Sequence, residues 1–115
     1  MKSDKKWMIY GANGYTGRIV VDEAIKKNLN PILAGRSTII KELAEEKGLE
    51  YEIFDLSLIE NIALKLSNIS VLANCAGPFS ATAKLMIPAC IKSNTHYIDI
   101  TGEISVYDYA QDQKC

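Results

Sequence analysis

The residues best placed to do chemistry form a glycine-rich string near the amino terminus. Its members are Gly11, Ala12, Asn13, Gly14, Tyr15, Thr16 and Gly17. Glycines at the spacing G-x-x-G-x-x-G permit a tight turn and let backbone amides approach a pyrophosphate at the positive end of the following helix. The string follows a predicted strand and opens a predicted amphipathic helix, which is the context of a dinucleotide site. We therefore expect a dinucleotide to bind here; the competing interpretation is a glycine turn that serves packing alone.

The end of the second predicted strand distinguishes two dinucleotides. Arg36 stands there between Gly35 and Ser37, and no Asp or Glu occurs between Glu23 and Glu42. An acidic residue at this point normally holds the free ribose 2′-hydroxyl of NAD, whereas a guanidinium offers forked donors to the 2′-phosphate of NADP. The sequence therefore favours NADP over NAD as the cofactor. The alternative is that Arg36 is an ordinary solvated surface charge.

Two further loops are expected at the same site, because ligands bind outside the carboxyl ends of parallel strands. After the third strand, Asp55 and Leu56 should lie near the adenine, although Asp55 could equally begin a turn. After the fourth strand, the residues expected on the nicotinamide side are Asn74, Cys75, Ala76, Gly77 and Pro78. A lone cysteine such as Cys75 is more often a small buried apolar residue than a reactive one.

The sequence assigns no catalytic residue. His96, the only histidine, falls at the start of the fifth predicted strand, opposite the nucleotide end, so a structural role is favoured. Asp99 and Glu103 fall at the correct end of that strand. Helix capping or inter-domain bonding would suit them; contacts to a substrate or a second domain are what the family resemblance given below implies, and the two interpretations are equally open.

Short apolar stretches alternate with segments of helical period along the whole chain, which predicts an α/β fold with a parallel sheet. The expected architecture is a Rossmann-type doubly wound sheet of five to six strands with helices on both faces. Strands are expected at residues 7–10, 32–34, 49–54, 69–73 and 95–100, with the third nearer the sheet edge. The first two helices should face inward with Gly17, Val20, Val21, Ala24, Ile25, Ile40, Leu43 and Ala44.

Particular residues mark the ends of the later helices. Gly48 should end the second helix, and Ser57 with Glu60 matches a capping box for the third. The fourth should span about residues 81–93 with Pro88 inside it. A proline there predicts a kink, or a helix that starts late with Pro88 in its first turn. A further helix is expected after residue 102.

Composition fits one globular domain. The chain has 115 residues, of which 48% are apolar and 23% charged, with a net charge of −1. That charge argues against a nucleic-acid partner, and no apolar run approaches the roughly 18 residues of a membrane span. The three cysteines match neither a disulfide framework nor a C-x-x-C metal pattern. We expect a cytoplasmic protein without a metal site.

Five strings taken together resemble the amino-terminal NADP-binding domain of the saccharopine dehydrogenase-like family, in its branch that includes enoyl reductase relatives. They are Y-G-A-N-G-Y-T-G at 10–17, L-A-G-R-S at 33–37, F-D-L at 54–56, N-C-A-G-P-F at 74–79 and T-H-Y-I-D-I-T-G-E at 95–103. The resemblance implies a Rossmann domain, nucleotide contacts at the glycine string and Arg36, and a parent oxidoreductase with a second domain for substrate and dimerisation. Asn94 stands where family members often have Gly, and Asn enters the left-handed region readily.

This resemblance makes residues 1–115 the cofactor domain of a longer two-domain chain. The domain would position the nicotinamide for hydride transfer to a small-molecule substrate held by the second domain, and it would be inactive alone, with a homo-oligomer possible. The alternative is a non-catalytic dinucleotide-sensing module. A short-chain dehydrogenase, suggested by Asn-Cys-Ala-Gly at 74–77, would need Tyr-x-x-x-Lys, and no tyrosine here has a lysine four residues on.

Overall fold

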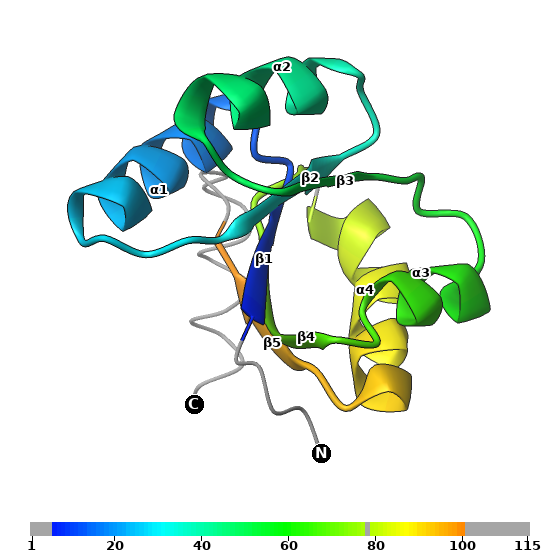
Figure 1. Ribbon diagram of the computed structural model, residues 1–115. Helices are drawn as coiled ribbons and strands as arrows, with labels where there is room; N and C mark the ends of the chain where they lie inside the picture. The colour runs from blue at the N-terminus through cyan, green and yellow to red at the C-terminus, as the bar shows by residue number, and fades with distance from the viewer. Residues whose placement is uncertain (1–5, 78, 101–115) are drawn as a thin grey trace, which may run out of the picture.

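A parallel sheet of five strands forms the centre of the computed structural model, which describes residues 6–77 and 79–100 (Figure 1). In chain order the strands are β1 (Lys6–Tyr10), β2 (Ile32–Gly35), β3 (Tyr51–Ile53), β4 (Ile69–Asn74) and β5 (His96–Asp99). The helices are α1 (Tyr15–Lys26), α2 (Ile39–Lys47), α3 (Ile59–Lys65) and α4 (Phe79–Ser93). Strands and helices alternate strictly, as predicted.

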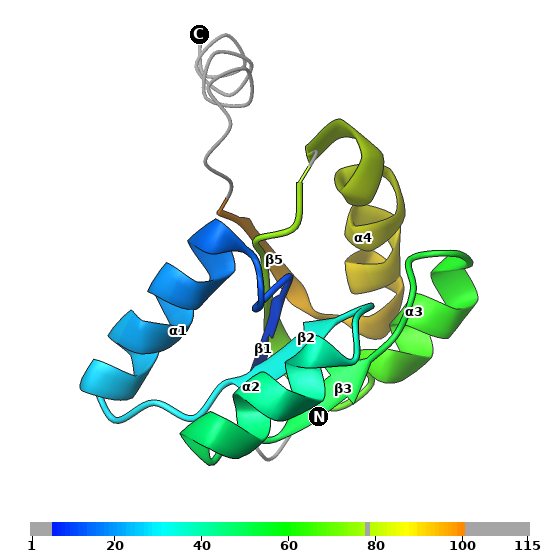
Figure 2. The same ribbon diagram turned by 90° about the horizontal axis from the view of Figure 1, so that it is seen from above.

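The sheet is doubly wound, in agreement with the sequence prediction. The strands lie in the order β3-β2-β1-β4-β5, so the chain crosses back over the sheet between β3 and β4. Figure 2 shows α1 and α2 on one face and α3 and α4 on the other. The direction of winding therefore reverses between β1 and β4, and the carboxyl ends of these neighbours open a crevice there.

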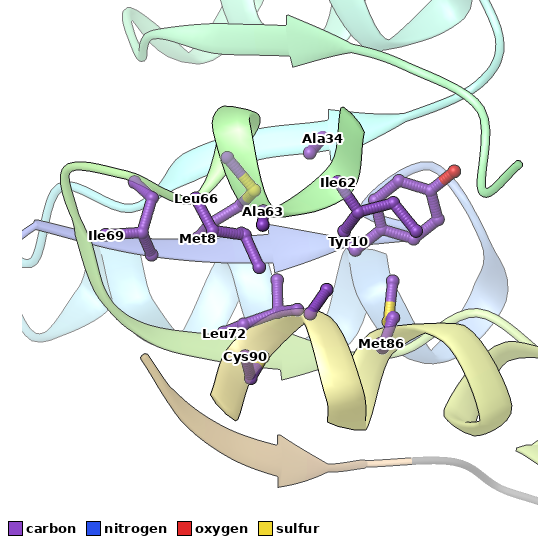
Figure 3. Close-up of a cluster of buried hydrophobic side chains, with 11 residues drawn as sticks. Met8, Tyr10, Ala34, Ile62, Ala63, Leu66, Ile69, Leu72, Met86 and Cys90 are labelled. Atoms are coloured by element: carbon purple, nitrogen blue, oxygen red, sulfur yellow. The ribbon is translucent and has the colours of Figure 1, made fainter. Parts of the chain in front are cut away.

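The core forms because the central strands are apolar on both faces. Figure 3 shows the cluster between the sheet and helices α3 and α4, where Met8, Leu72 and Met86 are buried. A second cluster on the other face includes Ile9 and Leu33. The edge strands β3 and β5 are more exposed, which confirms that the third strand lies at the edge.

Two residues in the left-handed region end helices as the sequence suggested. Gly48 has φ +72° and closes α2. Asn94 has φ +60° just after α4, so this asparagine takes the conformation that the resemblance assigned to a glycine.

The capping box predicted for α3 and one of the two alternatives for α4 were wrong. Leu58 is the N-cap of α3, with no side-chain cap hydrogen bond, because Ser57 lies one residue too early to reach the first free amides. The late-start alternative for α4 also fails: the helix begins at Phe79 and runs through Pro88 to Ser93. The helix expected after residue 102 lies outside the described residues.

Within residues 6–77 and 79–100, no helix is both long and apolar enough to span a bilayer. In the same part of the chain, no three His, Cys, Asp or Glu side chains are grouped so that they could hold a metal ion.

The third glycine of the string is required by packing. A Cβ on Gly17 would collide with the Gly11 carbonyl oxygen and would lie 2.8 Å from the Ala12 Cα. Both obstacles are backbone atoms, which cannot rotate away. The first turn of α1 therefore packs directly against the loop that precedes it.

We predict that Gly17→Ala lowers the free energy of unfolding by about 1 to 3 kcal/mol, the usual range for an overpacked site. Helix propensity alone predicts the opposite sign, since alanine is about 1 kcal/mol better than glycine inside a helix. Urea unfolding followed by circular dichroism decides between them. An unchanged or raised midpoint would contradict the packing contact.

Candidate functional site

A cavity of about 1120 Å³ opens at the carboxyl edge of the sheet. The loops after β1, β2, β3 and β4 form it together with the first turns of α4. Its lining residues are Tyr10, Gly11, Asn13, Gly14, Tyr15, Thr16, Gly35, Arg36, Ser37, Asp55, Leu56, Ser57, Cys75, Ala76, Gly77, Ala81, Thr82 and Leu85. The cavity spans the switch point between β1 and β4, where open α/β sheets bind ligands.

Most of the predicted site residues meet in this cavity. They are Gly11, Asn13, Gly14, Tyr15, Thr16, Gly35, Arg36, Ser37, Asp55, Leu56, Cys75, Ala76 and Gly77. Ala12, Gly17 and Asn74 are not among the lining residues. Pro78 lies outside the described residues.

The three exceptions serve the structure around the cavity. Ala12 is fully buried in the core on the α1 face, and Gly17 packs on the glycine loop. Asn74 is also fully buried, and its side chain bonds to groups on α4, β5 and the loop after β4. They therefore shape the cavity without facing it.

The three glycines of the string have different reasons to be glycine. Gly11 has φ +83°, and a Cβ there would lie 2.8 Å from the Ala76 backbone nitrogen. Gly14 has φ −79° and ψ 175°, a conformation open to any residue, and an added Cβ would meet only the Gly11 oxygen at 3.4 Å. Neither packing nor conformation therefore explains Gly14, whose open side lines the cavity.

The amino terminus of α1 presents partial positive charge to the cavity. Gly14 is its N-cap, no side chain caps it, and its first turn holds no acidic residue. Tyr15 and Thr16, the first residues of the helix, line the cavity. The first amides of a helix lack intrahelical partners, so this end suits an anion.

Arg36 occupies the end of the cavity formed by β2 and β3. Its side chain is exposed, and none of the ion pairs in the described part of the chain involves it. The Ser37 hydroxyl beside it accepts a hydrogen bond from the Ile39 amide at 3.2 Å, which fixes the turn into α2. Arg36 therefore directly precedes a turn that a hydrogen bond fixes.

Tyr10 is a lining residue that the sequence analysis missed. Its hydroxyl donates to the Phe54 carbonyl at 2.8 Å, and its ring lies 5.1 Å from the Phe54 ring. Burial, with a smaller contribution from the charge of Asp55 and against an opposing one from Arg36, raises the pKa of Tyr10 to about 12. The phenol is therefore protonated at neutral pH and ties β1 to the loop after β3. The sequence could have indicated that Tyr10 lines the site, because it is the last residue of β1 and the cavity lies at the carboxyl ends of the strands.

Helix α4 supplies three more residues that were missed: Ala81, Thr82 and Leu85. The predicted helix over residues 81–93 contains all three, but the sequence did not indicate that its first turns face the cavity. With them the β4 end of the cavity gains an apolar wall, in contrast to the Arg36 end.

Cys75 lines the cavity but is not an activated nucleophile. Burial, with a further contribution from the charge of Asp99, raises the pKa of its thiol to about 11. The reactive form of cysteine is the thiolate, so Cys75 stays a neutral thiol at physiological pH. Cys90 is buried in the core.

A smaller cavity of about 330 Å³ lies at the opposite edge of the sheet. Its walls include Lys6, Ile32 and Ile69, the first residues of β1, β2 and β4. His96 begins β5 at this same edge and is exposed, so it lies at the end of its strand opposite the main cavity, as predicted.

No family model matches the chain. A saccharopine dehydrogenase-like oxidoreductase of Bos taurus is 28% identical over 116 aligned residues, which cover 84% of this chain and 27% of the relative. The chain thus spans about a quarter of that protein's length.

Solved structures share the fold at low identity. Saccharopine dehydrogenase (L-Glu forming) from Saccharomyces cerevisiae superposes with a TM-score of 0.70 and 17% identity, over 84% of this chain and 21% of that one. Gre2 of Candida albicans, solved in complex with NADPH, superposes with a TM-score of 0.66 and 21% identity. The match covers 85% of this chain and 36% of Gre2. These matches show the Rossmann-type fold. Over 84% of its length the chain is similar in sequence to curated saccharopine dehydrogenase-like oxidoreductases.

Proposed function

We propose that this chain is the NADP-binding domain of an oxidoreductase. The observation that carries the proposal is the glycine loop: Gly14 faces the cavity, at the uncapped amino terminus of α1, with no packing reason to be glycine. A pyrophosphate that approaches the backbone supplies that reason, because a Cβ would obstruct it. The cavity residues therefore fit a dinucleotide.

The choice of NADP rests on Arg36. Arg36 lines the end of the cavity where an adenosine ribose lies in this type of fold, and no carboxylate follows β2 before Glu42. Asp55 enters the cavity from β3, the next strand, and we assign it to the adenine side. A forked cation binds a 2′-phosphate through charge-assisted hydrogen bonds, whereas the 2′-hydroxyl of NAD gains little from it.

The oxidoreductase part of the proposal comes from the relatives. The curated relatives are named oxidoreductases, and the Gre2 neighbour was solved in complex with NADPH. When bound, the nicotinamide supplies a hydride, and the protein contributes orientation and exclusion of water. The residues that would face the nicotinamide are Cys75, Ala76 and Gly77, with the α4 wall beside them. Substrate would be held by residues beyond this chain, since the relatives are about four times longer.

Arg36→Ala should weaken NADPH binding by about 1.5 to 3 kcal/mol, the loss expected for a charge-assisted contact, and leave NADH nearly unchanged. Isothermal titration calorimetry of both cofactors on the 115-residue chain measures this. Lys41→Ala is the matched control, because it removes the same charge from the exposed surface of α2. Equal losses for NADPH and NADH would refute the assignment of Arg36.

Gly14→Ala should weaken NADPH and NADH by the same factor, about tenfold or more, because a methyl group at the pyrophosphate overpacks the contact. The free energy of unfolding should fall by at most about 1 kcal/mol, the cost of a poorer N-cap. Calorimetry and urea unfolding on the same variant separate the two effects. Normal cofactor affinity in the folded variant would remove the main support for the proposed site.

A further inference from the structure

A row of polar side chains crosses the carboxyl ends of β4 and β5 beneath the main cavity. Asn74, fully buried at the end of β4, donates from Nδ2 to the Thr82 hydroxyl at 2.9 Å and to the Tyr97 hydroxyl at 3.0 Å. Its Oδ1 accepts from the Ala76 amide at 3.0 Å. The Tyr97 hydroxyl in turn donates to Asp99 Oδ2 at 2.8 Å.

These bonds have only one consistent direction. A carboxylate accepts but does not donate, so the hydroxyl proton of Tyr97 goes to Asp99 and its oxygen must accept from Asn74. Burial raises the pKa of Tyr97, and Asp99 raises it further, so that proton is present at neutral pH. This is the same orientation of the Asn74 amide that the Ala76 N–H, which can only donate, requires of Oδ1. Tyr97, with its proton directed to Asp99, therefore supports that orientation from the β5 side.

The network bonds to both the backbone amide and the backbone carbonyl of Ala76. The Ala76 amide donates to Asn74 Oδ1, and the Thr82 hydroxyl donates to the Ala76 carbonyl at 3.2 Å. On its other side, Ala76 lies so close to Gly11 that a Cβ on Gly11 would be 2.8 Å from the Ala76 nitrogen. Ala76 is a cavity wall fixed between the network and the glycine loop.

The part of the ligand that this wall meets follows from strand order. Arg36 lies after β2, on one side of β1, and Ala76 lies after β4, on the other. A dinucleotide with its 2′-phosphate at Arg36 and its pyrophosphate at Gly14 extends its other half over β4. The network therefore lies beneath the nicotinamide half.

We propose that Tyr97 is a positioning residue: by accepting a hydrogen bond from Asn74, its hydroxyl holds in place the loop at residues 75–77 against which the nicotinamide half of the dinucleotide docks. Tyr97 itself is not a lining residue of the cavity. The inference rests on the proposed function, because it concerns the same site. A merely structural role would change the stability of the protein without distinguishing between the halves of the ligand.

The test compares a whole ligand with half of it. Wild type and Tyr97→Phe are titrated by calorimetry with NADPH and with adenosine 2′,5′-bisphosphate, which lacks the nicotinamide half. Tyr97→Phe should lower the affinity for NADPH about fivefold, the usual effect of losing one buried hydrogen bond. Its affinity for the bisphosphate should stay within about twofold of the wild-type value. Urea unfolding confirms that each variant is folded at the titration temperature.

Tyr10→Phe is the matched control, because it removes a tyrosine hydroxyl from the opposite end of the cavity. That hydroxyl holds the loop after β3, on the adenosine side, so both ligands should weaken by the same factor. Asp99→Asn is a second test of the network with little change in volume. The amide introduced at residue 99 can donate to the Tyr97 hydroxyl, so the hydrogen bonds no longer have a single direction. Binding of NADPH should therefore weaken, and binding of the bisphosphate should not.

Normal NADPH affinity in both Tyr97→Phe and Asp99→Asn would overturn the inference. Equal losses of NADPH and the bisphosphate in these variants would overturn it as well, by pointing to a purely structural role. Failure of the wild type to bind either ligand would contradict the proposed function itself, and the inference with it.

Discussion

The site depends on backbone contacts at the glycine loop that are too close for a side chain. Gly17 packs on the carbonyl of Gly11, and Gly11 packs on the backbone of Ala76. These contacts join α1, the loop after β1 and the loop after β4 at the switch point of the sheet. The amino terminus of α1 is thereby held over the crevice between β1 and β4. Every other cavity residue is arranged around that fixed centre.

Much of this arrangement was predictable because local chemistry and tertiary structure agree. The inward faces of α1 and α2 were predicted from periodicity, and Gly17, Val21, Ile40 and Leu43 are buried there. A parallel sheet then brings the ends of its strands to one edge. Residues such as Gly14, Arg36 and Asp55 meet in one cavity for that reason, although they lie far apart in the sequence.

The failures occurred where tertiary packing overrides a local signal. Ser57 and Glu60 have the spacing of a capping box, but the chain enters α3 one residue later. Of the two alternatives for Pro88, the late start is wrong, because α4 begins at Phe79 and runs through the proline. Asn74 was assigned to the cavity, whereas its amide is used by a buried network whose other members come from α4 and β5. No local pattern in the sequence specifies that kind of partnership.

The central claim is that a dinucleotide lies along the carboxyl edge of the sheet with its phosphates at α1. Amide chemical shifts of the isotope-labelled chain, followed by nuclear magnetic resonance while NADPH is added, test it residue by residue. The account predicts saturable shifts at Gly14, Tyr15 and Thr16, with further shifts at Arg36. Shifts confined to the opposite edge of the sheet, or no shifts at millimolar cofactor, would contradict it.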